Sequence, residues 1–409
     1  MDYQIESFCK LICSVLHKDA DYDLEHISDW TSLVKMAREH NLLPVFMEKA
    51  VQYSKYIERP EYLLEMQEVL SEINSQVKRT NAFLKIYDVL RKNGVCPIVM
   101  KGIICRELYG ELCDHRISID EDVLIRYDEY WKAKSLLLEN GYVTNLEGET
   151  EQDLKRVQEV SFVNEQEGLH IELHLNPMGH DDFERSRMSN YFTNVFDDIR
   201  EVTVQGVSVY TMSHENHLLY LILHAFKHFT GGGFGIRQML DILLYQQSYS
   251  CEIDMTWLGE KLQDFKALLF WNDIVCIGNM YLGFNLQLLR KANCPQDLLE
   301  DAIHRGTFGN NTQEEMIAAR AITFATGNNS TGNGGNSIKM VWKAVFPNKI
   351  YLLDNSPYLE NKPWLLPLAW LQRWGRFIKK SKASGGNLTG KSMKISQERL
   401  KLMKKYDLV

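Results

Sequence analysis

The stretch Arg116-Ile-Ser-Ile-Asp-Glu-Asp-Val-Leu-Ile125 alternates in polarity along most of its length. A period of two is typical of a β-strand, whose successive side chains point to opposite faces. Ser118, Asp120 and Asp122 therefore share one face with Leu124, and the other face takes Ile117, Ile119, Glu121, Val123 and Ile125. Carboxylates two residues apart on a strand lie roughly 6 to 7 Å apart along the backbone, so both can reach one divalent cation or a close pair. The stretch predicts a metal-binding strand, and the alternative is an acidic strand end in a turn.

A second short strand is predicted just upstream. The apolar run Val95-Cys-Pro-Ile-Val-Met100 is bounded by Gly94 and by Lys101-Gly102, which is typical of a buried strand that turns into a helix, here expected over 103–112. Glycine lets another group approach the backbone closely, and the N–H groups that begin a helix can face a phosphate. We therefore expect Lys101 and Gly102 to bind a phosphate group, with the lysine adding positive charge.

A third strand is predicted at Gly168-Leu-His-Ile-Glu-Leu-His-Leu-Asn176, which also alternates. His170, Glu172 and His174 share one face, and apolar residues share the other. The alternative is a half-exposed strand with a polar outer face and no further role. Two hairpins are also predicted, one pairing 160–163 with this strand and one pairing 202–204 with 207–209.

These three elements, in this order, resemble an uncharacterised nucleotidyltransferase-like family of bacterial proteins in the polymerase-beta-like nucleotidyltransferase superfamily. The residues that carry the resemblance are Lys101-Gly102, Arg116, Asp120 and Asp122. The resemblance implies an α+β fold, with a mixed β-sheet core flanked by helices and with N-terminal and C-terminal helical regions. It implies transfer of a nucleoside monophosphate from a nucleoside triphosphate to a hydroxyl acceptor, with release of pyrophosphate.

The resemblance also implies the catalytic and metal-binding residues. Asp120 and Asp122 would hold two Mg²⁺ (or Mn²⁺) ions. Glu172 would be the third carboxylate, sharing one ion and drawing the acceptor hydroxyl toward ionisation. Lys101 and Arg116 would stabilise negative charge on the phosphates.

One departure from the family pattern concerns the grip on the triphosphate. Better-studied relatives carry a serine after the glycine, whose hydroxyl helps to hold the triphosphate, whereas Ile103 follows Gly102 here. Arg116 either substitutes for that hydroxyl by binding phosphate oxygens in a bidentate way, or forms a structural salt bridge with a nearby acid such as Asp114. Ser118, on the face of the carboxylates, is expected in the same nucleotide site.

A helix that begins after Ser213 carries further candidates for the nucleotide site. His224 and His228 are four residues apart, which would suit a metal ion, although no third ligand is evident in the sequence. The resemblance implies instead that these histidines, with Arg237 and Asp241, lie near the active cleft. Arg237 and Asp241 are spaced as an ion pair on one helix face. The alternative is that all four stabilise helix packing.

The pattern of periodicity divides the chain into four segments. Residues 1–80 are predicted to be helical, 81–210 to form the nucleotidyltransferase-like core, 211–325 a helical domain, and 326–409 a flexible loop followed by a C-terminal helical segment. In the first segment Trp30, Ala37, His40 and Pro44 match the family's opening pattern, and we expect them to pack rather than to catalyse.

The C-terminal segment combines an apolar run with a basic tail. Trp364-Leu-Leu-Pro-Leu-Ala-Trp-Leu371 is too short to span a bilayer, and Pro367 is expected to interrupt it. Docking of this run onto the protein body is favoured over an interfacial membrane helix. The basic tail from Lys379 to Lys405 is predicted to be partly disordered or to make a weak contact with an anionic partner. The Gly/Asn/Ser-rich stretch 326–337 is predicted to be a mobile loop.

Composition restricts the class of protein. A net charge of −8 gives no general reason to expect nucleic-acid binding, because proteins that bind the phosphate backbone carry a basic surplus. The eight cysteines form no Cys-x-x-Cys pair and are expected to be reduced core residues. The N-terminus lacks a basic segment followed by an apolar stretch, so a cytoplasmic location is expected.

The expected partners are a nucleoside triphosphate and an acceptor that the sequence does not identify. A small molecule, such as a sugar or an antibiotic hydroxyl, is favoured over a nucleic-acid end or a protein side chain. Two other hypotheses stand beside transfer. One is a non-catalytic nucleotide- or partner-binding protein on a degenerate nucleotidyltransferase fold, and the other is a helical scaffold.

Overall fold

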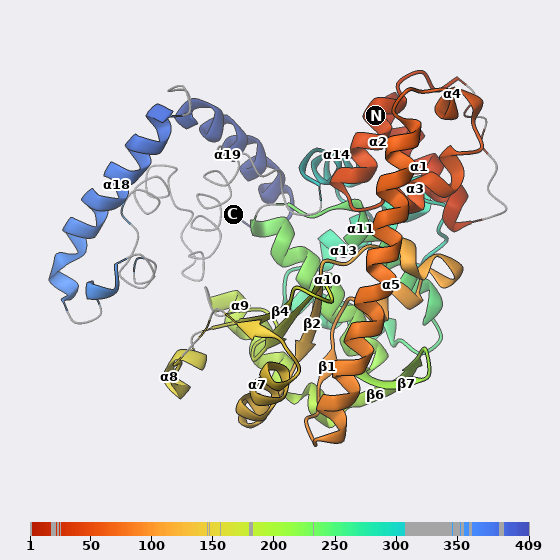
Figure 1. Cartoon of the computed structure of the whole chain (residues 1–409). Helices are drawn as coiled ribbons and strands as arrows, with labels where there is room; N and C mark the ends of the chain where they lie inside the picture. Colours follow the sequence, from red (N-terminus) through yellow and green to blue (C-terminus); the bar gives the residue numbers. More distant parts are fainter. Residues whose placement is uncertain are drawn as a thin grey trace. The chain divides into compact units, whose positions relative to one another are not determined.

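The computed structural model describes residues 2–17, 22, 24, 26–144, 146, 148–155, 157–179, 183–231, 233–306, 346, 352, 356–359, 362–383 and 388–408. The chain forms two compact units, and Figure 1 shows their helices and strands in the colours of the sequence. The first unit comprises Met1–Lys227 and Gly235–Thr307, and the second comprises His228–Phe234 and Phe308–Val409. The two units are described separately below.

The sheet of the first unit contains seven strands within the described residues, in the order β3-β4-β5-β2-β1-β7-β6. Their bounds are β1 Ile98–Val99, β2 Asp120–Leu124, β3 Val143–Thr144, β4 Glu159–Asn164, β5 Leu169–His174, β6 Ile199–Val204 and β7 Val207–Met212. Neighbouring strands are antiparallel except for the parallel pairs β2 with β5 and β1 with β7. This mixed sheet, flanked by helices, confirms the predicted α+β fold.

Both predicted hairpins are present. β4 pairs with β5 from Glu159↔His174 to Asn164↔Leu169. β6 pairs with β7, and the connecting residues Gln205 and Gly206 both have positive φ, at 47° and 81°. Two consecutive residues of positive φ give the backbone twist that a two-residue hairpin loop requires.

Helices make up the rest of the first unit. Before the sheet lie α1 Tyr3–Leu16, α2 Trp30–Glu39, α3 Leu43–Ala50, α4 Ser54–Ile57 and α5 Tyr62–Lys92. Between successive strands of the sequence lie α6 Ile103–Glu107, the 3₁₀ helices η1 Gly110–His115, η2 Tyr127–Glu129 and η3 Phe192–Asp197, and the α-helices α7 Tyr130–Glu139, α8 Glu151–Leu154 and α9 Phe183–Tyr191. After the sheet come α10 His214–Gly231, whose end belongs to the second unit, α11 Ile236–Ser248, α12 Met255–Asp264, α13 Leu268–Tyr281 and α14 Pro295–Arg305.

The long helix α5 joins the N-terminal helices to the sheet, as Figure 1 shows. Its C-terminal half packs, together with α7, against the apolar face of the sheet, where Val123 and Leu173 are buried. The Tyr87 hydroxyl of α5 donates to the carbonyl of Pro97 at 2.8 Å and accepts from the N–H of Tyr210 at 2.7 Å. One side chain therefore anchors the helix to the segment entering β1 and to β7.

Helix α10 contacts strand β7 through a buried polar side chain. The Nδ1 atom of its His217 lies 3.0 Å from the Thr211 hydroxyl of β7, which donates to the carbonyl of Val99 in β1 at 2.8 Å. The pair links α10 to the adjacent strands β1 and β7, and the face of the sheet toward α5 and α7 holds the apolar core.

Several local predictions differ from the structure. The helix after Gly102 ends at Glu107, and η1 follows it. The acidic strand begins at Asp120 rather than at Arg116, so Ile119 precedes it and is 54% exposed instead of packing on the apolar face. Glu121 does point to that face and is buried there. The predicted mobile loop at 326–337 lies outside the described residues.

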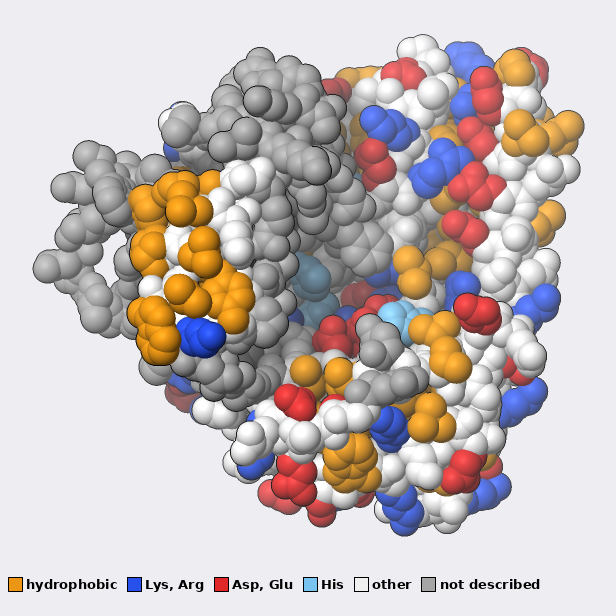
Figure 2. All heavy atoms as spheres, turned by 60° about the vertical axis from the view of Figure 1, so that its left-hand side comes forward, with side chains coloured by type: hydrophobic (Ala, Val, Ile, Leu, Met, Phe, Trp, Pro, Cys, Tyr) orange, Lys and Arg blue, Asp and Glu red, His pale blue; other side chains and the backbone are white. Residues whose placement is uncertain are grey.

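In the second unit, the described helices include the 3₁₀ helices η4 Pro357–Leu359 and η5 Pro363–Leu365 and the α-helices α18 Leu366–Ala383 and α19 Leu388–Lys405. The prediction that Pro367 interrupts a helix is wrong, because the proline lies in the first turn of α18, where its missing N–H costs no helical hydrogen bond. Figure 2 shows hydrophobic side chains gathered on the described surface of this unit. Across the described residues, no helix is long and apolar enough to cross a membrane.

His40 connects the N-terminal helices to the start of α11. Its Nδ1 atom accepts a hydrogen bond from the backbone N–H of Ile236 at 3.2 Å, and its side chain is fully buried. Burial lowers the pKa of His40 from 6.5 to about 4, because a charged imidazolium would be desolvated there. The packing role expected for His40 thus includes a hydrogen bond across 196 residues of sequence.

Replacing His40 should change how stability depends on pH. The folded protein keeps His40 neutral down to about pH 4, whereas the unfolded chain takes up the proton below about pH 6.5, so this contribution is present above pH 6.5 and is lost as the pH falls toward 4. From pH 7 to pH 5 the wild type should lose unfolding free energy because of His40, and His40→Gln should not. We therefore expect the loss in the wild type to exceed the loss in His40→Gln by about 2 kcal/mol. Urea unfolding at both pH values measures this, with the exposed His26→Gln as control. Equal pH dependence in wild type and His40→Gln would contradict it.

Candidate functional site

The parallel pairing of β2 with β5 builds the candidate site. In its register Asp120 lies opposite His170, Asp122 opposite Glu172 and Leu124 opposite His174. Partners in a parallel pair point to the same face, and neighbouring strands are roughly 4.8 Å apart. The acidic strand and the His-x-Glu-x-His strand therefore present their polar side chains side by side, on the face away from α5 and α7.

Asp122 is buried, and two cationic groups balance its charge. Its Oδ2 atom lies 2.9 Å from the Nζ atom of Lys101, and its Oδ1 atom lies 3.0 Å from the Nε2 atom of His174. Burial by itself would raise the pKa of Asp122, but the Lys101 ammonium and the hydrogen bond from His174 outweigh burial and hold this pKa well below its usual range. Asp122 is therefore ionised throughout the neutral pH range.

His174 lies among three carboxylates. Besides Asp122, the Oε2 atom of Glu172 is 3.6 Å from its Nε2 atom, and the Oε2 atom of Glu159 is 3.4 Å from its Nδ1 atom. Burial alone would lower the pKa of His174, but its bonds to Asp122 and Glu172 raise this pKa to about 9. The imidazole is therefore protonated at neutral pH.

Three side chains of this site could hold a metal ion. Asp122, Glu172 and His174 each offer a ligand atom, His174 only after losing its proton, and these atoms all lie within 4.8 Å of one another. Two of the three predicted carboxylates are thus brought together, and His174 joins them. Asp120 lies two residues before Asp122, at the start of β2, and is not a member of this group. Burial and the nearby charge of Asp122 raise the pKa of Asp120.

The turn at Gly102 is occupied by an anion from the protein itself. The N–H of Ile103, which begins α6, donates to the Oε2 atom of Glu121 at 2.9 Å, and the other carboxylate oxygen of Glu121 lies 2.6 Å from Arg106. Gly102 has φ of 52°, and a Cβ atom there would lie 1.9 Å from Glu121 Oε2. The close approach that the glycine allows is therefore made by Glu121. In this structure the Ile103 N–H, expected to face a phosphate, faces a carboxylate.

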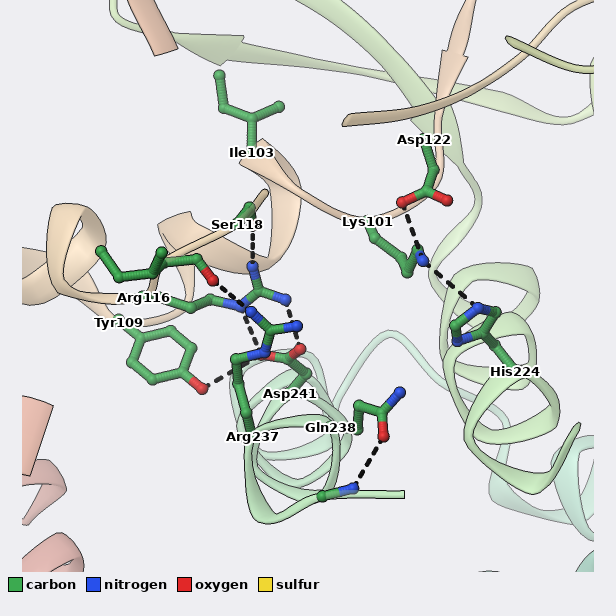
Figure 3. Close-up of polar contacts among 12 residues, drawn as sticks. Lys101, Ile103, Tyr109, Arg116, Ser118, Asp122, His224, Arg237, Gln238 and Asp241 are labelled. Atoms are coloured by element: carbon green, nitrogen blue, oxygen red, sulfur yellow. Dashed lines mark hydrogen bonds and ion pairs between the residues drawn. The ribbon is translucent and has the colours of Figure 1, made fainter. Parts of the chain in front are cut away.

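Arg116 is fixed in a buried ion pair. Its Nε and Nη2 atoms donate to the two carboxylate oxygens of Asp241 at 2.7 and 2.5 Å, and its Nη1 atom donates to the Ser118 hydroxyl at 2.7 Å (Figure 3). The Tyr109 hydroxyl also donates to Asp241, at 3.2 Å. Arg116 thus forms a salt bridge, as one of the two hypotheses for it holds, but its partner is Asp241 of α11 rather than Asp114.

The other predicted nucleotide-binding residues lie in three different settings. Arg237 does not form the expected ion pair with Asp241; its Nη1 atom donates to the carbonyl oxygen of Ile117 instead. His224 of α10 lies with its Nε2 atom 3.3 Å from the Lys101 Nζ atom, on the side away from Asp122 (Figure 3). His228 belongs to the second unit, and its role in nucleotide binding stays a prediction.

Two residues of the site were not identified as such from the sequence. The signal for His174 was present, because alternation places it on the same face as Glu172, but a histidine on a polar strand face is common and singles out nothing. Glu121 gave no usable signal. It lies 18 residues from the N–H that it accepts, and only the return of the chain through β2 brings the two together.

The Arg116–Asp241 pair should be costly to break. Replacing Asp241 by asparagine leaves a buried guanidinium without its counter-charge, so we expect Asp241→Asn to lower the free energy of unfolding by about 3 to 5 kcal/mol. The double variant Arg116→Met with Asp241→Leu, which removes both charges, should lose less. Denaturant unfolding checks this, with Asp88→Asn as control. Asp88 pairs with Lys92 at 2.6 Å on the exposed surface, where such a pair contributes at most about 1 kcal/mol. A loss from Asp241→Asn no larger than from Asp88→Asn would contradict the prediction.

Gly102 should not tolerate a side chain. The Cβ of Gly102→Ala would displace the Glu121 carboxylate from the Ile103 N–H and from Arg106, leaving buried polar groups unpaired. Gly168→Ala is the matched control, because Gly168 has a similar φ of 61° and open space around its Cβ position. We expect thermal unfolding to show a loss at Gly102→Ala that exceeds the loss at Gly168→Ala by at least about 2 kcal/mol. Equal losses would show that Glu121 moves aside freely.

Comparison with known proteins assigns the chain to a family. A family described as "Uncharacterised nucleotidyltransferase" matches residues 26–276, which is more than half of the chain and includes β1 to β7 and the whole candidate site. No curated protein and no solved structure matches the chain. The match covers the Lys101-Gly102 turn, both strands of the acidic group and the helix of Asp241. The chain therefore belongs to the uncharacterised nucleotidyltransferase family.

Proposed function

We propose that this protein is a metal-dependent nucleotidyltransferase of the polymerase-beta-like superfamily, which moves a nucleoside monophosphate from a nucleoside triphosphate to a hydroxyl acceptor. In this reaction the acceptor oxygen forms a bond to the α-phosphorus, the bond from the α-phosphorus to the bridging oxygen breaks, and pyrophosphate leaves. The proposal rests chiefly on the convergence of Asp122, Glu172 and His174 in a chain that belongs to a nucleotidyltransferase family.

The donor set fits a hard divalent cation. Carboxylate oxygens are the ligands that Mg²⁺ and Mn²⁺ prefer, and Asp122 and Glu172 provide them within 4.8 Å of each other. Asp120, two residues before Asp122 on the same face of β2, would add a further oxygen from the strand end. A cation bound there would neutralise phosphate charge and orient the α-phosphate.

The residues around the carboxylates have distinct roles in this proposal. His174 donates to Asp122, and so fixes the orientation of that carboxylate. Lys101, whose ammonium lies beside Asp122 and His224, supplies positive charge for the triphosphate. Glu172 has a side chain that is 19% exposed, against 3% for Asp122, so it is the member that an acceptor hydroxyl can approach.

Arg116 has a positioning role rather than a phosphate-binding one. Its guanidinium is held at both ends, by Asp241 and by Ser118, so it fixes the chain just before β2 against α11. Glu121 acts similarly at Gly102, where it holds the start of α6 beside Lys101. Arg116 and Glu121 would therefore hold the backbone so that Lys101 stays within contact distance of Asp122.

Nucleotide binding that requires a metal would test the proposal directly. A ligand that binds only the folded state raises the melting temperature by mass action, so a thermal-shift titration with ATP, GTP, CTP and UTP, each with and without Mg²⁺ or Mn²⁺, needs no acceptor. We expect a shift that requires both the triphosphate and the metal. In Asp122→Asn with Glu172→Gln this shift should be absent, while the far-ultraviolet circular dichroism spectrum is unchanged.

Glu165→Gln is the matched control, since Glu165 lies in the exposed turn of the same β4–β5 hairpin. It should keep the full metal-dependent shift. Because the substitutions can alter stability by themselves, each protein is compared with its own ligand-free melting temperature. An unchanged metal-dependent shift in the double variant would refute the assignment of these carboxylates, and no shift with any triphosphate would refute nucleotide binding.

A second candidate function is nucleotide or partner binding without catalysis on the same fold. The observation that favours it is the ion-pair network, in which Lys101 and His174 already neutralise Asp122 and Glu121 fills the start of α6. The two functions differ in their products. Transfer releases pyrophosphate from the triphosphate when an acceptor is present, whereas a binding protein shows the melting-temperature shift and releases no pyrophosphate.

A further inference from the structure

One face of α18 is apolar and exposed. Trp364, just before the helix, is 70% exposed, Leu368 is 44% exposed and Leu371 is 60% exposed. Leu368 and Leu371 are three residues apart and so lie on one side of α18, while Trp364 lies in η5, which leads directly into the helix. Figure 2 shows hydrophobic side chains gathered on the described surface of the second unit, which carries this helix.

The opposite face of α18 already has its packing partners within the second unit. Ala369 is fully buried in a small cluster with Leu352 and Leu359, and Trp370 and Leu366 pack against this cluster. The exposed face is therefore not the one that holds the helix in place. The exposed side chains of Trp364, Leu368 and Leu371 are therefore available to a partner outside this cluster.

The charge of the same segment is the opposite of that of the whole chain. Residues 366–405, which include α18 and α19, contain eleven lysines and arginines and a single acid, Glu398, although the chain as a whole has a net charge of −8. The helix α18 itself carries Arg373, Arg376, Lys379, Lys380 and Lys382 and no acid. Such a local concentration of positive charge attracts an anionic surface.

We infer that α18 docks on an anionic membrane surface, with Trp364, Leu368 and Leu371 entering the boundary between headgroups and acyl chains. Binding of an interfacial helix combines burial of apolar side chains with attraction of basic residues to anionic headgroups, and this segment has both. Tryptophan is enriched at that boundary because its ring is apolar and its N–H is polar. A nucleic acid would use the positive charge but gives no reason for two exposed leucines on the same face. The inference concerns recruitment and does not depend on the proposed transfer reaction.

Co-sedimentation of the full chain with lipid vesicles tests the inference. Vesicles of phosphatidylcholine alone are compared with vesicles that also contain phosphatidylserine, at 0.1 M and 0.5 M NaCl. We expect binding to the anionic vesicles only, and weaker binding at the higher salt concentration. Trp364→Ser with Leu371→Ser should lower the partition coefficient by about tenfold or more. Lys379→Glu with Lys382→Glu should lower it as well.

The matched control is Leu63→Ser with Leu64→Ser. These leucines of α5 are 70% and 69% exposed but lie outside the basic segment, so this variant should bind vesicles as the wild type does. Equal binding of the Trp364/Leu371 variant and the wild type would overturn the inference, and so would no binding to anionic vesicles. Two further results would overturn it in favour of another occupant: binding of a single-stranded oligonucleotide without vesicle binding, or a dimer that the Trp364/Leu371 variant converts to a monomer without vesicle binding.

Discussion

The parallel pairing of β2 with β5 is the constraint on which the candidate site depends. It places Asp122 opposite Glu172 and brings His174 within hydrogen-bonding distance of Asp122. A shift of the pairing by one residue would turn every side chain of one strand to the other face, and the carboxylates would point into the apolar layer under α5 and α7. That layer favours the register, because a one-residue shift would take Val123 or Leu173 out of it.

Buried charge is balanced locally throughout the site. Three acids that lie deep in the first unit each have a cationic partner: Glu121 has Arg106, Asp122 has Lys101 and His174, and Asp241 has Arg116. Moving an isolated charge from water to the interior costs several kcal/mol, so a carboxylate kept there for a function requires such compensation. The same pairings hold the backbone before β2 and at the start of α6, which is how they position Lys101 beside Asp122.

The two units of the chain have different characters. The first holds the sheet and the acidic group, while the second has a small apolar cluster, two long helices and the basic segment 366–405. The membrane docking inferred for α18 would concentrate the protein at a surface without changing the acidic group itself. Membrane recruitment and chemistry would then reside in different parts of one chain.

The sequence by itself determined the elements of the core and the type of fold. The alternation in 116–125 and 168–176 was enough to predict two strands and their polar faces, and the order of Lys101-Gly102, Arg116 and Asp120-x-Asp122, followed by the strand of Glu172, carried the resemblance to the family. Both hairpins were predictable because each pairs two runs that are neighbours in the sequence. Local patterns are readable because each depends only on residues within a few positions of one another.

Only the tertiary structure decided which charged groups meet. Arg116 contacts Asp241, 125 residues away in the sequence, and Lys101 contacts His224, 123 residues away. Sequence proximity had suggested Asp114 as the partner of Arg116, and helical spacing had suggested Arg237 as the partner of Asp241. Glu121 reaches the Ile103 N–H because the chain returns beside it. The physical reason is that desolvation makes a buried charge take whichever partner the packed fold brings within contact distance, and sequence spacing does not encode that distance.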